Sequence, residues 1–178
     1  PARSTYAEDD AAGLWYWGTL LLSPDANMII HAYGDEGAVT GYDLTGQVLF
    51  TYSFGSRVWA LAISPDGRLL AVAGLQNNVV IFYLETYKPV TNLASDYECI
   101  CNLVFSPDGT TLVVGYERPG NVIKLWDTAT WQETSIFTHA SQRIDYHDIL
   151  FTPDGTQLLL ADHKIGDLIG VRIWDLAS

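Results

Sequence analysis

A turn phrase written four times along the chain constrains the fold more than any other feature of the sequence. It occurs as Ser23-Pro24-Asp25, Ser64-Pro65-Asp66, Ser106-Pro107-Asp108 and Thr152-Pro153-Asp154, each time at the end of an apolar segment. Proline presets the first dihedral of a turn and aspartate closes the turn through backbone hydrogen bonds, so each phrase predicts a hairpin. Successive phrases are 41, 42 and 46 residues apart (23 to 64, 64 to 106, 106 to 152). This period is typical of four-stranded propeller blades, which repeat every 40 to 45 residues or so.

Short apolar segments between polar turns divide each repeat into strands. The first repeat predicts strands over 16–22, 28–33, 38–44 and 47–52, and the second over 58–63, 68–74, 79–84 and 89–93. The third predicts 100–105, 111–116, 122–126 and 134–138, whereas the fourth offers only 145–151, 157–161 and 169–174. We therefore predict an all-β fold, a β-propeller of four four-stranded antiparallel blades whose last blade lacks a strand.

The chain divides into a short N-terminal segment and four repeats. Residues 1–13 are polar and acidic, and the repeats occupy about 14–56, 57–95, 96–141 and 142–178. Residues 3–6 can form a short strand. We expect this N-terminal segment to supply the strand missing from the fourth blade, in the same chain or in a partner chain. The alternative is that the chain is a fragment or half of a longer propeller.

A short aromatic signature lies at or near the end of the third strand of each repeat, as Tyr42-Asp43, Phe82-Tyr83, Trp126-Asp127 or Trp174-Asp175. Together with the Ser-Pro-Asp turns, this signature resembles the WD-repeat β-propeller family over residues 14–178. The resemblance implies a Gly-His pair before each blade and a buried His, Ser/Thr, Asp and Trp tetrad within it. Here the positions ten residues before each turn are Gly13, Phe54, Asp96 and Gln142.

The tetrads are therefore degenerate. His139 with Trp174, and Asp162 in place of the serine, is the candidate for a partial tetrad. We expect the other blades to be held by apolar packing.

Ring closure carries the next expectation, because each blade buries its faces only against neighbouring blades. Four small blades would make a strained ring, whereas propellers that resemble this chain usually close in sevens or eights. Twofold symmetry is the commonest symmetry of soluble oligomers. We therefore predict that the chain is half of an eight-bladed ring, completed by a second chain in a homodimer.

Charge bounds the choice of partner. Nine Lys and Arg residues face 21 Asp and Glu residues, which gives a formal net charge of −12. This balance argues against nucleic acid or an anionic membrane and favours a basic protein or peptide. No apolar run approaches the roughly 20 residues that cross a bilayer. Cys99 and Cys101 lie two apart on a predicted strand, so we expect free thiols on one face and a reducing, cytoplasmic setting.

Function in a propeller comes from the loops at its faces and from its central channel. Extra residues lie between second and third strands or before first strands, and these connections share one face. Arg and aromatic side chains are frequent interface anchors. The predicted partner-binding residues are Arg57, Trp59, Tyr97, Glu98, Arg118, Arg143, Tyr146 and His147. The simpler interpretation is that Trp59 and Tyr146 only fill gaps between blades.

Three functions remain open at this point. A noncatalytic protein-interaction scaffold is favoured, with no catalytic residue, no metal and no cofactor expected. An enzyme or ligand-binding site in the central channel would use Asp145 and His147, with Asp148, Asp162 and His163 nearby. Asp145 and His147 share one strand face while Asp148 takes the other, so these groups do not automatically converge. A sensor or regulatory segment of a larger signalling protein is the third possibility.

Overall fold

The computed structural model describes residues 3–9, 15–33, 37–118, 122–138, 149–163 and 169–176. Over these residues it contains strands and turns, and no helix that could cross a membrane. The first sheet, blade 1, has five strands in chain order: β1 (Arg3–Asp9), β2 (Trp15–Leu22), β3 (Met28–Tyr33), β4 (Ala38–Asp43) and β5 (Val48–Ser53). The all-β prediction is confirmed.

Three further antiparallel sheets follow along the chain. Blade 2 contains β6 (Val58–Ile63), β7 (Leu69–Gly74), β8 (Asn78–Tyr83) and β9 (Lys88–Ala94). Blade 3 contains β10 (Glu98–Phe105), β11 (Thr111–Arg118), β12 (Val122–Asp127) and β13 (Glu133–Thr138). Blade 4 contains β14 (Ile149–Phe151), β15 (Gln157–His163) and β16 (Ile169–Asp175), so it has three strands among the described residues. The four predicted blades are therefore present.

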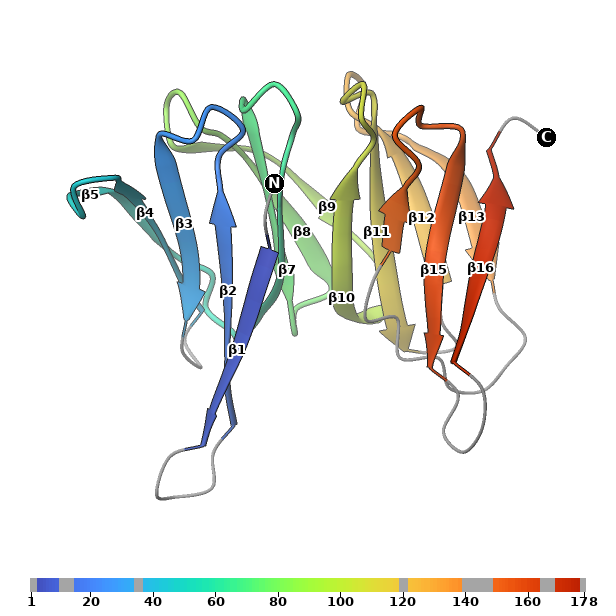
Figure 1. The fold of residues 1–178 in the computed structure, drawn as a ribbon, viewed down its shortest axis with the longest axis horizontal. Coiled ribbons are helices and arrows are strands. Elements are labelled where there is room, and N and C mark those ends of the chain that lie inside the picture. Colours follow the sequence, from blue (N-terminus) through green and yellow to red (C-terminus); the bar gives the residue numbers. More distant parts are fainter. Residues whose placement is uncertain are drawn as a thin grey trace.

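The blades stand side by side in chain order and form an open arc (Figure 1). At the inner edge of the arc lie β2, β6, β10 and β14, which we call the inner strands. Here β2 contacts β6, β6 contacts β10, and β10 contacts β14. Blades 1 and 4 are the two ends of this arc (Figure 1). The N-terminal strand β1 pairs antiparallel with β2 and not with β16. Completion of blade 4 by this segment in a partner chain stays a prediction.

Apolar side chains alternate between the two faces of each sheet and fill the seams between blades. Leu21 and Ile30 of blade 1 are buried in one cluster with Leu70 and Phe82 of blade 2. A second cluster joins blades 2 and 3, and a third joins blades 3 and 4. Blades 2 and 3 each have a neighbouring blade on both faces, so their strands are apolar on both faces. In Leu69–Gly74 of blade 2, for example, five of the six residues are buried.

The Ser-Pro-Asp turns repeat one hydrogen-bonded design. In the blade 2 turn, the Ser64 hydroxyl donates to Asp66 Oδ1 at 2.6 Å and accepts the Leu69 amide at 2.9 Å. The Gly67 amide closes the turn on the Ser64 carbonyl at 2.9 Å, and Gly67 has a φ of 73°. The other turns have the same bonds, and Ala26 takes the left-handed position in blade 1 with a φ of 57°.

A β-bulge interrupts the inner strand of blade 3. The register of β10 against β11 shifts between Ile100 and Asn102, so Cys101 is the extra residue. Cys99 has a φ of 57°, outside the extended region. Neither cysteine forms a disulfide, both side chains are half-buried, and the Cys101 thiol donates to the Gly115 carbonyl at 3.6 Å. Strict alternation, on which we expected the two cysteines to share a face, therefore does not hold here.

Candidate functional site

Two faces of the arc differ in what they carry. The Ser-Pro-Asp turns lie on one face, which we call the turn face (Figure 1). The connections before β6 and β10 and the turn between β7 and β8 lie on the other face, which we call the loop rim. Its described segments are residues 54–57, 75–77 and 95–97.

Hydrogen bonds tie the loop rim together. The Phe54 amide donates to the Gly37 carbonyl at 3.0 Å, and Gln76 Nε2 donates to the Phe54 carbonyl at 3.3 Å. The Ser95 amide donates to the Asn77 carbonyl at 2.8 Å. Gly37, just before β4, and the turn between β7 and β8 are therefore hydrogen-bonded to the segments that lead into β6 and β10. The rim is a braced surface, as a binding site on a scaffold requires.

Arg57 and Trp59 lie at the start of β6, on this braced rim. The register of β6 against β7 shifts between Val58 and Ala60, so Trp59 is the extra residue of a bulge. Bulges re-aim a side chain relative to the strand. Trp59 is half-buried and belongs to none of the seam clusters. The carbonyl of Arg57 accepts the Leu75 amide at 3.1 Å.

Tyr97 and Glu98 lie at the equivalent place before and within β10. Tyr97 packs against Tyr116 with ring centroids 5.5 Å apart, and Lys124 Nζ lies 5.0 Å above the Tyr97 ring. Its ring therefore belongs largely to the packing between blades 2 and 3. Glu98 is exposed and lies opposite Arg118 in the strand register.

A buried charge in blade 3 escaped the sequence prediction. Lys124 Nζ lies 2.7 Å from Glu133 Oε2, and the Lys124 side chain is only 12% exposed. The ammonium also lies 6.0 Å from the ring of Trp126, and burial raises the pKa of the neighbouring Tyr116 phenol. Apolar clusters fill the seams between the blades, as expected for blades with degenerate tetrads, and this ion pair between β12 and β13 adds a polar contact within blade 3. The available signal was a lysine at a strand position where blade 2 has valine.

Other predicted residues lie outside the described part of the chain. Arg143, Tyr146, His147, Asp145 and Asp148 belong to that group, as does His139 of the partial tetrad. Arg118, Asp162 and His163 end described strands, but their side chains are not described. Among the residues that are described, no group of three or more His, Cys, Asp or Glu side chains could hold a metal ion.

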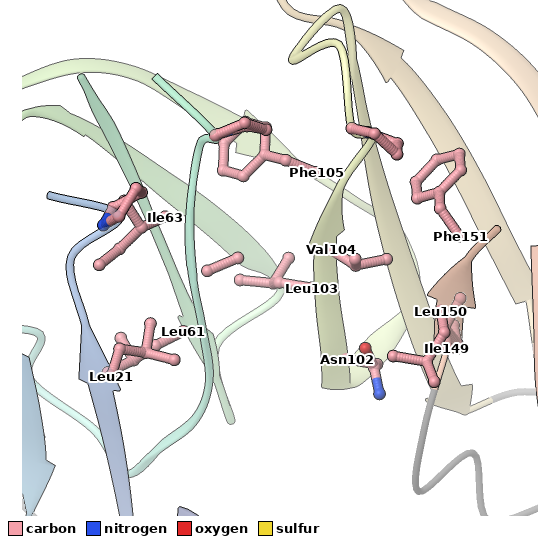
Figure 2. Close-up of a pocket in the computed structure, with 14 residues that line it drawn as sticks. Leu21, Leu61, Ile63, Asn102, Leu103, Val104, Phe105, Ile149, Leu150 and Phe151 are labelled. Carbon is pink, nitrogen blue, oxygen red and sulfur yellow. The ribbon is translucent and has the colours of Figure 1, made fainter. Parts of the chain in front are cut away.

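An apolar groove of about 560 Å³ follows the inner edge of the arc (Figure 2). Side chains from all four inner strands line it, including Leu61, Leu103 and Leu150. Asn102 is its buried polar side chain, and the prolines of three Ser-Pro-Asp turns belong to its lining. This lining can accept apolar groups, and it offers little chemistry for a reaction.

The turn face carries hydrogen-bonded carboxylates. The Ser106 hydroxyl donates to Asp108 at 2.5 Å, and this bond, followed by the Thr110 amide, lowers the pKa of the Asp108 carboxyl. The pKa of Asp127 is lowered in the same way, first by the Thr130 hydroxyl. The same direction holds for the carboxyls of Asp25, Asp43, Asp66 and Asp154. These side chains are built into turns and remain ionised at neutral pH.

Four antiparallel blades, each with a Ser-Pro-Asp or Thr-Pro-Asp turn between two strands of its own sheet, define a propeller-type repeat protein. The family of the WD domain, G-beta repeat, matches residues 46–83 and 87–127, which lie mostly in blades 2 and 3. The chain therefore carries WD repeats, in a structure with the blade architecture of a β-propeller.

Curated relatives share these repeats. A WD repeat-containing protein of Synechocystis, sll1491, is 32% identical over 143 residues, which are 79% of this chain and 39% of the relative. The small ribosomal subunit protein RACK1 of Candida albicans is 34% identical over 125 residues, which are 65% of this chain and 38% of the relative. The chain thus spans about two fifths of the length of these relatives.

A solved structure agrees on the fold. The hydrazine synthase of Kuenenia stuttgartiensis superimposes with a TM-score of 0.76 over 89% of this chain and 45% of that one. The two sequences are 21% identical. This similarity extends to the arrangement of blades and does not extend to chemistry.

Proposed function

We propose that this chain is a noncatalytic, cytoplasmic protein-interaction scaffold that binds a protein or peptide on its loop rim. The family supports this proposal, because WD-repeat propellers are commonly interaction platforms. Some relatives are named as a ribosomal protein, and one of Pyricularia oryzae is named as an interacting protein.

Trp59 with Arg57 is the observation that carries the proposal. Both lie where β6 leaves the braced rim, and the bulge separates Trp59 from the seam packing. Interface energy concentrates in Trp, Tyr and Arg side chains held on rigid supports. Glu98 adds an exposed carboxylate at the equivalent place in blade 3.

The partner in this proposal is basic. A net charge of −12 gives the molecule a negative potential that speeds encounter with cationic partners. A peptide with Lys or Arg beside an apolar side chain would match the carboxylate of Glu98 and the ring of Trp59. The scaffold itself acts as a homo-oligomer in this proposal, a dimer that closes an eight-bladed ring.

Selection from a peptide phage library rich in Lys and Arg tests the proposal. Peptides selected on the native chain are measured by calorimetry against Trp59→Ala and against Trp131→Ala. Trp131 is the matched control, because it is also half-buried but lies in the turn after β12, on the turn face. We expect Trp59→Ala to weaken binding at least tenfold and Trp131→Ala to change it less than twofold.

Each variant is first checked for folding by circular dichroism, so that a loss of binding reports on contact and not on unfolding. Equal weakening by both tryptophan variants would contradict a rim site. Failure to select any basic peptide on the native chain would remove the proposed partner chemistry.

A further inference from the structure

Blade 4 turns an apolar face away from blade 3. Leu150, Val171 and Ile173 are 55%, 67% and 59% exposed. Leu159 lies between Leu150 and Ile173 in the strand register, so Leu150, Leu159 and Ile173 form one row across the sheet. The other face of the same sheet is buried against blade 3 through Ile149, Leu158 and Leu160. A contiguous exposed apolar row of this kind marks an interaction surface.

The repeat tells which surface this is. Leu150 stands two residues before Thr152 and Ile173 immediately precedes Trp174. In blade 3 the same positions are Val104 and Leu125, which pack against blade 4. In blade 2 they are Ala62 and Ile81, in the seam with blade 3, and in blade 1 the first is Leu21, in the seam with blade 2. The exposed face of blade 4 is therefore the face that every other blade packs against its successor.

Blade 1 presents the opposite face at the other end of the arc. Leu22, Ile29 and Tyr42 lie opposite one another in the strand register and are half-buried. In blade 4 the positions of Leu22 and Tyr42 are held by Phe151 and Trp174, which pack against blade 3. The outer face of blade 1 is thus the face that every other blade packs against its predecessor.

The turns repeat the same relation. A Cβ placed on Gly67 would lie 3.8 Å from Pro24 Cδ, and one on Gly109 would lie 3.6 Å from Pro65 Cδ. Gly155 has the same relation to Pro107, at 3.5 Å. The proline of each turn therefore lies against the fourth turn residue of the next blade. Among these four turns, Pro153 is the proline of the last turn, in blade 4. Ala26 holds the glycine position of the first turn, in blade 1.

We infer that the outer face of blade 4 binds the outer face of blade 1 of a second copy of this chain. The occupant follows from continuity with the three seams already present, since the two leftover faces are the two halves of one such seam. Contacts between unlike faces are head-to-tail, and they form a ring when the rotation closes. Two copies give eight blades and two identical seams, within the four to eight or so blades of known propellers. This inference rests on the homo-oligomer of the proposed function and specifies its interface.

Light scattering after size-exclusion chromatography tests the interface on the 178-residue chain. We expect twice the mass of one chain for the native protein, and the mass of one chain for Ile173→Glu and for Ile29→Glu. Ile136→Glu is the matched control, because Ile136 is a 45% exposed strand isoleucine away from both end faces. It should leave the dimer intact. Val171→Glu, at the most exposed of these positions, serves as a second variant if Ile173→Glu unfolds.

Mixing separates a head-to-tail seam from a symmetric one. The Ile173→Glu chain keeps an intact blade 1 face and the Ile29→Glu chain keeps an intact blade 4 face, so their mixture should regain one seam and form a heterodimer. A dimer that persists in Ile29→Glu but not in Ile173→Glu would show blade 4 against blade 4 and overturn the inference, as would a native monomer. Peptide binding that depends on Trp59 is read separately, so the rim can fail while the seam holds, or the reverse.

Discussion

Replacing Ala26 with glycine should stabilise the protein, although alanine already occupies the site. Ala26 has a φ of 57°, whereas Gly67, Gly109 and Gly155 hold the same turn position with φ between 72° and 74°. A left-handed conformation costs a residue with a Cβ roughly 1–2 kcal/mol. Glycine in turn adds unfolded-state entropy that lowers stability by about 0.4–1 kcal/mol. The net expectation for Ala26→Gly is therefore a gain of about 0.5–1 kcal/mol.

Calorimetry at fixed protein concentration measures this gain. For a chain of this size, 1 kcal/mol shifts Tm by about 2–4 °C, so Ala26→Gly should raise Tm by about 1–4 °C. The matched reverse change is Gly109→Ala. A Cβ there would lie 3.6 Å from Pro65 Cδ, which is ordinary contact, so the net loss of about 0.5–1 kcal/mol would come from the backbone dihedral, reduced by the unfolded-state entropy that alanine removes. An unchanged or lower Tm in Ala26→Gly beside an unchanged Tm in Gly109→Ala would refute this reasoning.

Three further predictions concern charge and close packing. Glu133→Gln should lower the free energy of unfolding by about 1–2 kcal/mol in urea titrations, because it leaves the buried Lys124 ammonium without its carboxylate while Glu133 itself is partly solvated. The turn aspartates have lower pKa values in the folded chain than the unfolded value near 3.8, so the free energy of unfolding should be flat above that pH and should fall as pH drops toward the folded pKa values. Urea melts from pH 7 to pH 3 measure this. Gly74→Ala should cost more than about 2 kcal/mol in thermal melts, since its Cβ would lie 2.0 Å from the Arg57 carbonyl oxygen, whereas Gly170→Ala, in open space, should cost much less.

The turn phrase predicted the blades because its geometry is local. Serine, proline and aspartate in sequence order make the hydrogen bonds of the turn, and the strands on either side need only alternate apolar side chains. The order of blades then follows from short antiparallel connections. The arrangement into blades could therefore be predicted from local turn and strand patterns.

Features that depend on distant partners escaped the sequence. The Lys124 and Glu133 pair forms because β12 and β13 are neighbouring strands of blade 3, and the lysine that stands where blade 2 has valine does not by itself name this partner. The bulge that places Cys101 outside the alternation depends on the pairing of β10 with β11. Trp59 was selected for its residue type and its place at the start of a strand, and the bulge at that position is a feature that residue type alone did not supply.

Hydrogen–deuterium exchange with a selected basic peptide tests the central claim, that the loop rim is the interaction surface, most directly. The account predicts added protection of the amides in residues 54–59, 75–77 and 95–98 on peptide binding, with little change in the turn at residues 64–68. Protection confined to the Ser-Pro-Asp turns, with the rim unchanged, would place the interaction surface on the opposite face and contradict the account.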